Sequence, residues 1–343
     1  MSRILSLVRP NIAALSPYST ARDEYGGPIG IFMDANESPY ENGYNRYPDP
    51  HQAELKALLG RLKGLKSENI FLGNGSDEAI DLIFRIFCVP GRDNVVAISP
   101  SYGMYTVAAA INDVAVHSVP LDENFLLDSG ALIAACDSNT RVIFLCSPNN
   151  PSGNAFPREQ LLDICRRFNG VVVVDEAYAD FSSNGSLAAD AVATDNLIVL
   201  QTLSKARAMA GLRIGMAISS SEIVGLMSRV KYPYNLSRAA MEKAFQLLEK
   251  PVEDEIRTIV AERQRLYSRL PSYPFIQKVF PSDANFLLVR VDDADKLYSF
   301  LLEKGIIVRN RSRIPGCAGC LRISIGLPAE NEALLNALDT YAI

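Results

Sequence analysis

The sequence predicts an α/β protein, with a doubly wound, mostly parallel sheet domain followed by a smaller C-terminal α+β domain. From about residue 50 to residue 220, helical patterns alternate with short apolar runs, which is the order expected of βαβ units. The runs are rich in β-branched residues and bounded by turn signals, as in strands buried on both faces. After Pro233, long charged helical patterns lead into a compact alternation of strands and helices. The 343 residues suffice for two such domains.

The individual elements follow from these patterns. The large sheet is predicted to contain strands at Val95–Ile98, Val142–Cys146, Val171–Val174 and Leu197–Leu200, and its helices to include Glu54–Leu62, Asp77–Phe87 and Arg158–Phe168. Charged helices are predicted over Arg238–Leu270 with a break at Pro251, followed by strands at Phe286–Val291, Ile306–Val308 and Leu321–Ile325 and helices at Ala294–Lys304 and Ala329–Tyr341. We therefore expect an arm or lid over residues 1–45 that packs with the small domain, a large domain over 46–250 and a small domain over 251–343.

Composition narrows the possible functions. The 34 Lys and Arg residues against 39 Asp and Glu give a net charge of −5, which argues against a nucleic-acid partner. The chain contains no apolar run long enough to span a membrane. Arg9-Pro10 interrupts the short apolar stretch Ile4–Val8, so a signal peptide is not expected either.

The cysteines indicate a reducing compartment. Cys88, Cys146 and Cys165 lie in apolar or helical surroundings, as reduced core cysteines do. Cys317 and Cys320 have the C-x-x-C spacing of a zinc knuckle or redox pair, but no second pair of ligands lies nearby. We expect a cytoplasmic protein without a metal.

The candidate reactive group is Lys205, which follows the apolar run Leu197–Leu200. This position is at the carboxyl edge of the predicted sheet, where open α/β folds bind ligands. Partial desolvation there lowers a lysine pKa and favours Schiff-base chemistry. On its own, the motif fits a surface lysine in a loop better.

Asp175 ends the four-valine run Val171–Val174, and Tyr178 follows three residues later. A carboxylate at the end of a buried strand needs a cation, and a protonated pyridine nitrogen is one such cation. Tyr178 is then placed to donate its hydroxyl to an oxygen on the same ring. A magnesium site or simple helix capping by Asp175 are the alternatives.

Three further turns follow predicted strands or precede a helix. Asn150 lies in a rigid turn fixed by Pro148, Pro151 and Gly153, although a plain Asn-Pro turn is common. Gly73-Asn74-Gly75-Ser76-Asp77 precedes an amphipathic helix, whose N-terminus offers an anion site or an ordinary N-cap. Tyr102 follows another strand and is suited to stacking on a flat ring, or to packing at a core edge.

Two arginines complete the set. Arg213 lies eight residues after Lys205, and Arg322 lies among apolar residues of a predicted strand. An arginine in such a strand is seldom buried without an anion, which a substrate or a structural ion pair would supply. Together the motifs provide a phosphate site, a stacking ring, a carboxylate, an oxygen donor and a lysine, all next to predicted strands.

With these motifs the chain resembles the fold-type I pyridoxal-phosphate (PLP) enzymes of the aspartate-aminotransferase superfamily and, more narrowly, the histidinol-phosphate aminotransferase family. The stretches that carry the resemblance are Ser16–Tyr18, Asp34–Pro39, Asn45–Pro48, Tyr102–Tyr105, Cys146–Pro151, Asp175–Tyr178, Thr202–Ala206, Ile306–Arg309 and Leu321–Ser324. Two positions depart from the family pattern. Ser152 stands where the family usually has Thr, and Arg207 stands where an aromatic residue often follows the Lys-Ala pair.

The resemblance implies a role for each matching residue. Lys205 forms the Schiff base with PLP and later moves the substrate Cα proton. Asp175 keeps the pyridine nitrogen protonated, Tyr178 and Asn150 hold the ring oxygen, and Tyr102 stacks on the ring. The residues implied to hold the cofactor phosphate are Ser76, Asp77, Ser204 and Arg213. The residues implied to hold the substrate are Arg322 for its acidic end, Tyr18, Arg309 and Tyr47 for its phosphate, and Asn36 in the lid.

The resemblance also implies a reaction and an assembly. The implied enzyme is a homodimer, with Tyr47 reaching in from the partner subunit, and it converts L-histidinol phosphate and 2-oxoglutarate to imidazole-acetol phosphate and L-glutamate in histidine biosynthesis. One arginine cluster must then accept a phosphate and a carboxylate in turn, which guanidinium groups can do. The alternatives are a PLP-dependent decarboxylase of a phosphorylated amino acid, an aminotransferase for aromatic amino acids, and a non-catalytic PLP-binding regulator.

Overall fold

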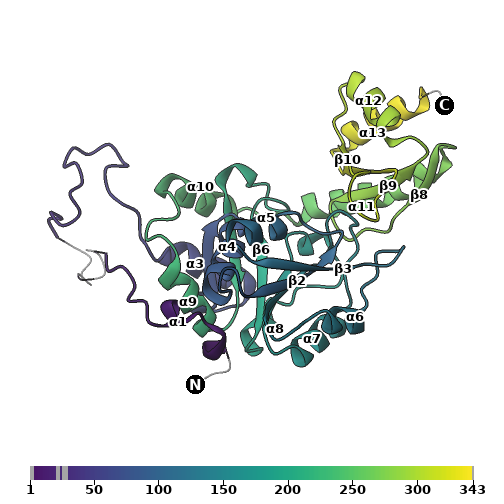
Figure 1. Ribbon diagram of the computed structural model, residues 1–343. Helices are drawn as coiled ribbons and strands as arrows, with labels where there is room; N and C mark the ends of the chain where they lie inside the picture. The colour runs from purple at the N-terminus through teal and green to yellow at the C-terminus, as the bar shows by residue number, and fades with distance from the viewer. Residues whose placement is uncertain (1–3, 21–23, 25–29, 342–343) are drawn as a thin grey trace.

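The computed structural model describes residues 4–20, 24 and 30–341 and has two sheets (Figure 1). The larger sheet has seven strands in the order β1-β7-β6-β5-β4-β2-β3. Their bounds are β1 Ile70–Asn74, β2 Asn94–Ser99, β3 Ala115–Pro120, β4 Thr140–Cys146, β5 Val171–Asp175, β6 Leu197–Thr202 and β7 Ile214–Ile218. Strands β2 to β6 are parallel, whereas β7 is antiparallel to β1 and β6. The predicted α/β class with a mostly parallel sheet is confirmed.

Helices cover both faces of the large sheet, because alternate strand residues point to opposite sides. Val172 and Val174 pack into one core cluster, and Val171 and Val173 into the other, all fully buried. The first cluster is covered by α3 Ala53–Lys63, α6 Ser129–Ala134, α7 Arg158–Arg167, α8 Ala188–Ala193 and α10 Arg238–Leu248. The second is covered by α4 Ser76–Phe87, α5 Met104–Ile111 and α9 Ser221–Val230.

The smaller sheet has four strands in the order β10-β11-β9-β8. Their bounds are β8 Ile276–Val279, β9 Phe286–Val291, β10 Arg309–Asn310 and β11 Cys320–Ser324. Helices α11 Glu253–Arg269, α12 Ala294–Glu303 and α13 Pro328–Asp339 bury Leu266, Leu297 and Leu334 against one face of this sheet. Leu288 and Cys320, on the other face, join the core of the large domain. The small sheet is therefore packed between its own helices and the large domain.

The predicted strand at Ile306–Val308 is wrong. The backbone N–H of Ile306 donates to Leu301 O at 2.8 Å and closes the end of α12. Pairing with β11 begins only at Arg309, which lies opposite Arg322. The run packs Val308 into the small-domain core while Ile307 is 78% exposed, but no described strand pairs with these three residues.

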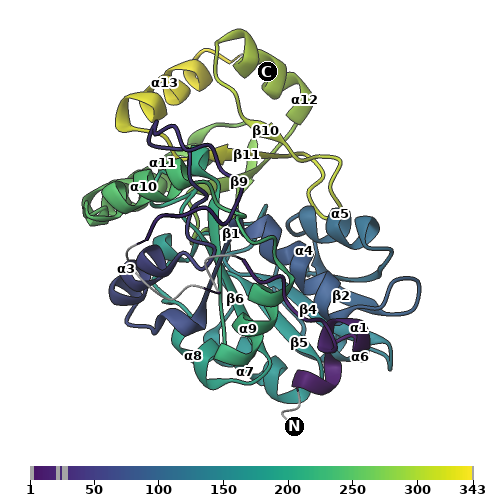
Figure 2. The ribbon, with the colours of Figure 1, turned by 90° about the vertical axis from the view of Figure 1, so that its left-hand side faces the viewer.

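The N-terminal residues differ from the predicted irregular arm beside the small domain. The short helices η1 Ile4–Leu7 and α1 Pro10–Ala13 bury Ile4 and Ile12 in the core cluster under α4 and α9. Figures 1 and 2 show α1 at the opposite end of the molecule from α12 and α13. The described part of the chain between α1 and α3 extends away from both domains (Figure 1). Residues 1–3, 21–23 and 25–29 of the predicted arm lie outside the described residues. No described helix has the length and apolar character needed to cross a membrane.

Candidate active site

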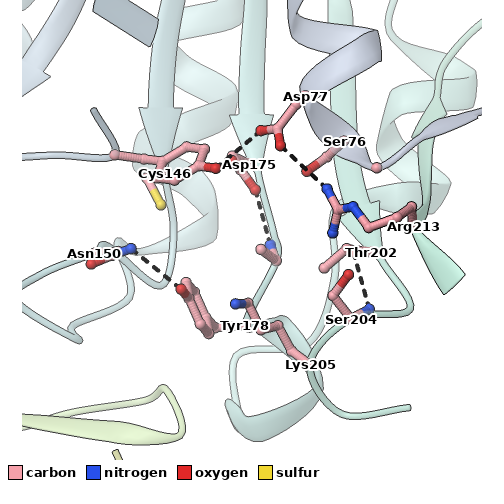
Figure 3. A pocket seen from close by; sticks show the side chains of 13 residues that line it. Ser76, Asp77, Cys146, Asn150, Asp175, Tyr178, Thr202, Ser204, Lys205 and Arg213 are labelled. Carbon is pink, nitrogen blue, oxygen red and sulfur yellow. Dashed lines mark hydrogen bonds and ion pairs between the residues drawn. The ribbon is translucent and has the colours of Figure 1, made fainter. Parts of the chain in front are cut away.

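A pocket lies at the carboxyl edge of the large sheet, where Cys146, Asp175 and Thr202 end neighbouring strands β4, β5 and β6 (Figure 3). Side chains at the ends of parallel strands meet at one edge of the sheet. All the residues that the sequence proposes for the cofactor line this pocket: Ser76, Asp77, Tyr102, Asn150, Asp175, Tyr178, Ser204, Lys205 and Arg213. The geometry therefore brings together residues from positions 76 to 213 of the chain.

Asp175 is the buried carboxylate of the site, with 2% of its surface exposed. The Tyr105 hydroxyl donates to its Oδ2 at 2.9 Å, and the Ala177 backbone N–H donates to its Oδ1 at 3.1 Å. Burial raises the pKa of Asp175 to about 6, and these two donors oppose that rise. No cationic side chain in the described part of the chain forms an ion pair with Asp175, so the site suits a cation from a bound molecule.

Lys205 follows β6 and extends into the pocket beside Tyr178 (Figure 3). Its Nζ lies 5.5 Å from the centroid of the Tyr178 ring. The pKa of Lys205 is lowered, first by burial and then by the positive charge of Arg322, while the charge of Asp175 opposes the change. A lowered pKa increases the fraction of neutral amine, which is the nucleophilic form.

A chain of hydrogen bonds connects the two domains and ends at Tyr178, next to Lys205. Arg322 Nη1, on the small sheet, donates to Asn150 Oδ1 at 2.6 Å, and Asn150 Nδ2 donates to the Tyr178 hydroxyl at 3.3 Å. Arg322 also places its Cζ 5.2 Å from the centroid of the Phe286 ring. Burial raises the pKa of Tyr178, so its hydroxyl stays protonated and can donate. The small domain is thus coupled directly to the pocket.

The other side of the pocket is suited to an anion. Helix α4 begins after Gly75, which has φ +75° and provides no side-chain cap. A Cβ on Gly75 would lie 2.7 Å from Arg213 Nη2, so only glycine lets that guanidinium approach the helix N-terminus. Free N–H groups, the helix dipole and a guanidinium together bind phosphate groups well.

The Asp77 side chain does not face the phosphate site as a direct ligand but contacts Tyr102 and Arg213. Its Oδ1 accepts the Tyr102 hydroxyl at 3.0 Å, and its Oδ2 lies 3.6 Å from Arg213 Nη2. The side chain therefore orients Tyr102 and Arg213. A phosphate would be repelled by this carboxylate, so Asp77 can contact one only through its backbone N–H.

The proposed substrate residues, unlike the cofactor residues, do not all lie at one pocket. Arg322 lies beside the pocket, and Arg309 is its neighbour across the β10–β11 pair. Tyr18 is 74% exposed, and Tyr47 is 53% exposed and stacks on Tyr234 with ring centroids 4.4 Å apart. Neither tyrosine lines the pocket, and neither does Asn36, which borders a separate hollow near Tyr47.

The sequence did not indicate two residues, Tyr105 and Asn149, that hold site residues in position. The Tyr105 hydroxyl donates to Asp175, whereas the sequence marks Tyr105 only as part of the stretch Tyr102–Tyr105 that resembles the family. Asn149 is fully buried and donates to Pro100 O at 3.0 Å and to Ser152 Oγ at 2.7 Å, which fixes the turn that carries Asn150. No local pattern marks Tyr105, because the carboxylate that it contacts lies 70 residues away along the chain.

Comparison with known proteins establishes the family. The family model described as aminotransferase class I and II matches residues 33–338. The chain belongs to this aminotransferase family. A curated histidinol-phosphate aminotransferase of Parabacteroides distasonis is 54% identical over 345 residues, which is 100% of both chains. Another, of Flavobacterium psychrophilum, is 46% identical over 338 residues and 98% of each chain.

Solved structures agree with this assignment. The aminotransferase matches the crystal structure of the histidinol-phosphate aminotransferase from Clostridium acetobutylicum with a TM-score of 0.78 and 27% identity, covering 85% of this chain and 89% of the other. It matches the enzyme from Sinorhizobium meliloti in complex with pyridoxal-5′-phosphate with a TM-score of 0.77 and 25% identity, covering 85% and 82%. The fold is that of the fold-type I PLP enzymes, and the aminotransferase uses PLP.

The pocket fits this cofactor on its own chemistry. Asp175 is a buried carboxylate without a cationic partner among the described residues, as a protonated pyridine nitrogen requires. Lys205 is a lysine of lowered pKa, as the aldehyde requires. The N-terminus of α4 with Arg213 suits the cofactor phosphate.

Proposed function

We propose that this aminotransferase transfers the amino group of L-histidinol phosphate to 2-oxoglutarate, giving imidazole-acetol phosphate and L-glutamate in histidine biosynthesis. The observation that carries the proposal is the full-length identity of 54% to a histidinol-phosphate aminotransferase. The pocket supports it, because Arg322 and Arg309 lie together at its small-domain side and can receive a phosphate or a carboxylate.

Lys205 and Asp175 carry the central chemistry in this proposal. Pyridoxal phosphate, when bound, supplies an aldehyde for the amino group and an electron-accepting ring. Lys205 Nζ holds the aldehyde carbon between turnovers and moves the proton at the substrate Cα. Asp175 holds a proton on the ring nitrogen, which its burial beside the Tyr105 hydroxyl favours.

The remaining cofactor residues bind and orient. Tyr178 and Asn150 hold the ring oxygen through their protonated hydroxyl and amide groups. Tyr102, oriented by Asp77, covers one face of the ring. The cofactor phosphate is held by the backbone N–H groups of Ser76 and Asp77 together with the side chains of Ser204 and Arg213.

We propose that the active site is completed in a homodimer. Tyr18, Asn36 and Tyr47 lie away from their own pocket, in or beside the segment that extends from the body of the molecule (Figure 1). This segment also exposes Ile31 and Met33, which are costly to leave in water. A partner subunit would cover these side chains and receive Tyr47 in its substrate site. The six cysteines are free thiols, which fits a cytoplasmic enzyme.

Complementation between inactive chains tests the shared site. A Tyr47→Phe chain, if weakly active, should regain activity when it is mixed with a Lys205→Ala chain. The reason is that one site of the mixed dimer then combines an intact Lys205 with an intact Tyr47. An Arg322→Ala chain serves as the control, because Arg322 binds Asn150 beside the pocket of its own chain and mixing cannot restore both Arg322 and Lys205 to one site. Absence of rescue for Tyr47→Phe would place Tyr47 in its own chain's site or outside catalysis.

The cofactor spectrum tests the reaction. Histidinol phosphate added to the PLP-loaded protein should convert the cofactor absorbance to that of the pyridoxamine form, and 2-oxoglutarate should restore it. Release of carbon dioxide from threonine phosphate, without net amino transfer, would favour a decarboxylase instead. A preference for unphosphorylated aromatic amino acids would favour an aromatic aminotransferase.

A further inference from the structure

Of the arginines on the face of the small sheet toward the large domain, three lie together at the β10–β11 pair, whereas Arg290 on β9 contacts Gly316 O and the Phe280 ring. Arg309 and Arg322 are direct partners across β10 and β11, and directly opposed residues in antiparallel strands share a face. The Arg311 backbone N–H donates to Cys320 O at 2.8 Å, which continues the pairing one step further. Because side chains alternate along a strand, Arg311 lies on the same face as Arg309. Cys320 on this face belongs to the core shared with the large domain.

Arg311 has no partner that explains its position. In the described ranges, its guanidinium forms no ion pair and no hydrogen bond, and its Nε is enclosed without an acceptor. Arg322 also has an enclosed Nε without an acceptor, and no carboxylate of the described chain pairs with Arg309, Arg311 or Arg322. Two partly buried guanidinium groups, Arg311 and Arg322, and the exposed Arg309 beside them are thus grouped without a negative charge from the described chain.

The charge of Arg311 interacts with those of residues beside the pocket. Its pKa is lowered, first by burial and then by the positive charges of Arg322 and Arg309, while Tyr178 has the opposite effect. In the proposed function, Arg322 and Arg309 bind the substrate anion, and Tyr178 lines the adjoining pocket. An anion bound between them would remove the repulsion among the arginines and provide the missing acceptors.

We propose that Arg311 is a third guanidinium of the substrate-anion site and favours a phosphate dianion over a carboxylate. This inference rests on the proposed function and adds to it a residue that sets substrate class. A carboxylate has two oxygens and one charge, which Arg322 and Arg309 can satisfy. A phosphate has three free oxygens and a second charge, so it can use a third guanidinium.

The test compares Arg311→Gln with Arg313→Gln in the PLP-loaded enzyme. Arg313 is an exposed arginine two residues away, so its variant makes the same change in charge outside the site. One measurement is calorimetric binding of inorganic phosphate at constant ionic strength. The other is the single-turnover rate with histidinol phosphate and with glutamate. Arg311→Lys is included because it keeps the charge and limits any effect on folding.

Arg311→Gln should weaken phosphate binding and kcat/KM for histidinol phosphate by roughly 10- to 100-fold, as expected for a lost charge-assisted hydrogen bond. The glutamate half-reaction should change far less, Arg311→Lys should be intermediate, and Arg313→Gln should match the wild type. If the wild type reacts with histidinol phosphate and Arg311→Gln behaves like Arg313→Gln, the role of Arg311 is refuted and the proposed function stands.

The two proposals can fail separately. If the wild type does not react with histidinol phosphate, the proposed function is wrong, and phosphate binding alone then decides the role of Arg311. Weaker phosphate binding by Arg311→Gln would still support an anion site there. Phosphate binding equal to that of Arg313→Gln would refute it.

Discussion

The two ends of the active site are built differently. The cofactor end is assembled at the ends of neighbouring strands in one sheet, where Tyr105 donates to Asp175 and Asn150 donates to Tyr178. In our proposal, the substrate end combines arginines of the small sheet with Tyr18 and Tyr47, which are mostly exposed in the single chain. A rigid sheet edge fixes the first set in advance, whereas the second set needs a domain contact and, in our proposal, a partner subunit. Substitutions at the two ends should therefore fail in different ways.

The largest effect is expected for Lys205→Ala, at the preformed end. This variant should lose the borohydride-fixable link to PLP and all measurable amino transfer, because no other amine lines the pocket in the described structure. Peptide mapping after borohydride treatment is the measurement. Lys63→Ala is the matched control, since burial also lowers the pKa of Lys63 but this residue lies outside the pocket. Labelling of a different lysine in the wild type would contradict the assignment.

The next largest effect is expected for Asp175→Asn. The amide keeps the shape of the side chain but has no charge with which to hold a proton on the ring nitrogen. The variant should bind PLP and lose several orders of magnitude in the rate of both half-reactions. Equal losses are expected because both half-reactions use the same ring nitrogen. A rate near that of the wild type would remove Asp175 from the mechanism.

The same carboxylate gives a pH-dependent prediction for the cofactor-free protein. The folded-state pKa of Asp175 is about 6, above the ordinary value of 3.8, so the folded state binds the extra proton. Stability from this group is therefore present at low pH and is lost as pH rises from about 4 to about 6. Over that range the cofactor-free wild type should lose on the order of 2–3 kcal/mol relative to Asp175→Asn. Urea unfolding at several pH values is the measurement, and parallel pH profiles for the two proteins would show that Asp175 is not strained by burial.

The cofactor end could be predicted from the sequence better than the substrate end, because its strands have local apolar patterns. Val171–Val174 and Leu197–Leu200 are apolar runs, so strands β5 and β6 could be predicted, and the residues after them could be placed at one sheet edge. The antiparallel direction of β7 depends on pairing with β1, about 140 residues earlier along the chain, and no local pattern encodes it. The contact of Tyr105 with Asp175 joins residues 70 positions apart, so only the folded chain shows it.

At the substrate end, the sequence could indicate which arginine binds an anion, but it could not show which arginines lie side by side. Arg322 could be singled out because an arginine within an apolar strand requires an anion. Arg311 could not, because its place beside Arg322 depends on where β10 begins, and the apolar run Ile306–Val308 predicted an earlier start. The pattern also gives no pairing register, so it does not show which residues lie opposite each other across two strands. The arginine cluster was therefore visible only in the structure.

The smallest effect is expected for Tyr18→Phe, at the substrate end. A phosphate dianion offers more acceptor oxygens than a carboxylate, so it uses a tyrosine hydroxyl that glutamate does not need. Loss of one such hydrogen bond to a charged group costs about 1.5–3 kcal/mol, or about one to two decades in kcat/KM. The histidinol phosphate half-reaction should therefore slow while the glutamate half-reaction stays close to normal.

Single-turnover kinetics of each half-reaction, followed by the cofactor absorbance, measure this difference. Arg322→Ala is the comparison, because Arg322 is coupled to the pocket through Asn150 and Tyr178 and should impair both halves. Equal losses in both halves for Tyr18→Phe would mean that Tyr18 acts on the cofactor end or on folding. The substrate end would then not distinguish the two anions through this side chain. A selective loss would instead show that a residue exposed in the single chain becomes part of the phosphate site in the assembled enzyme.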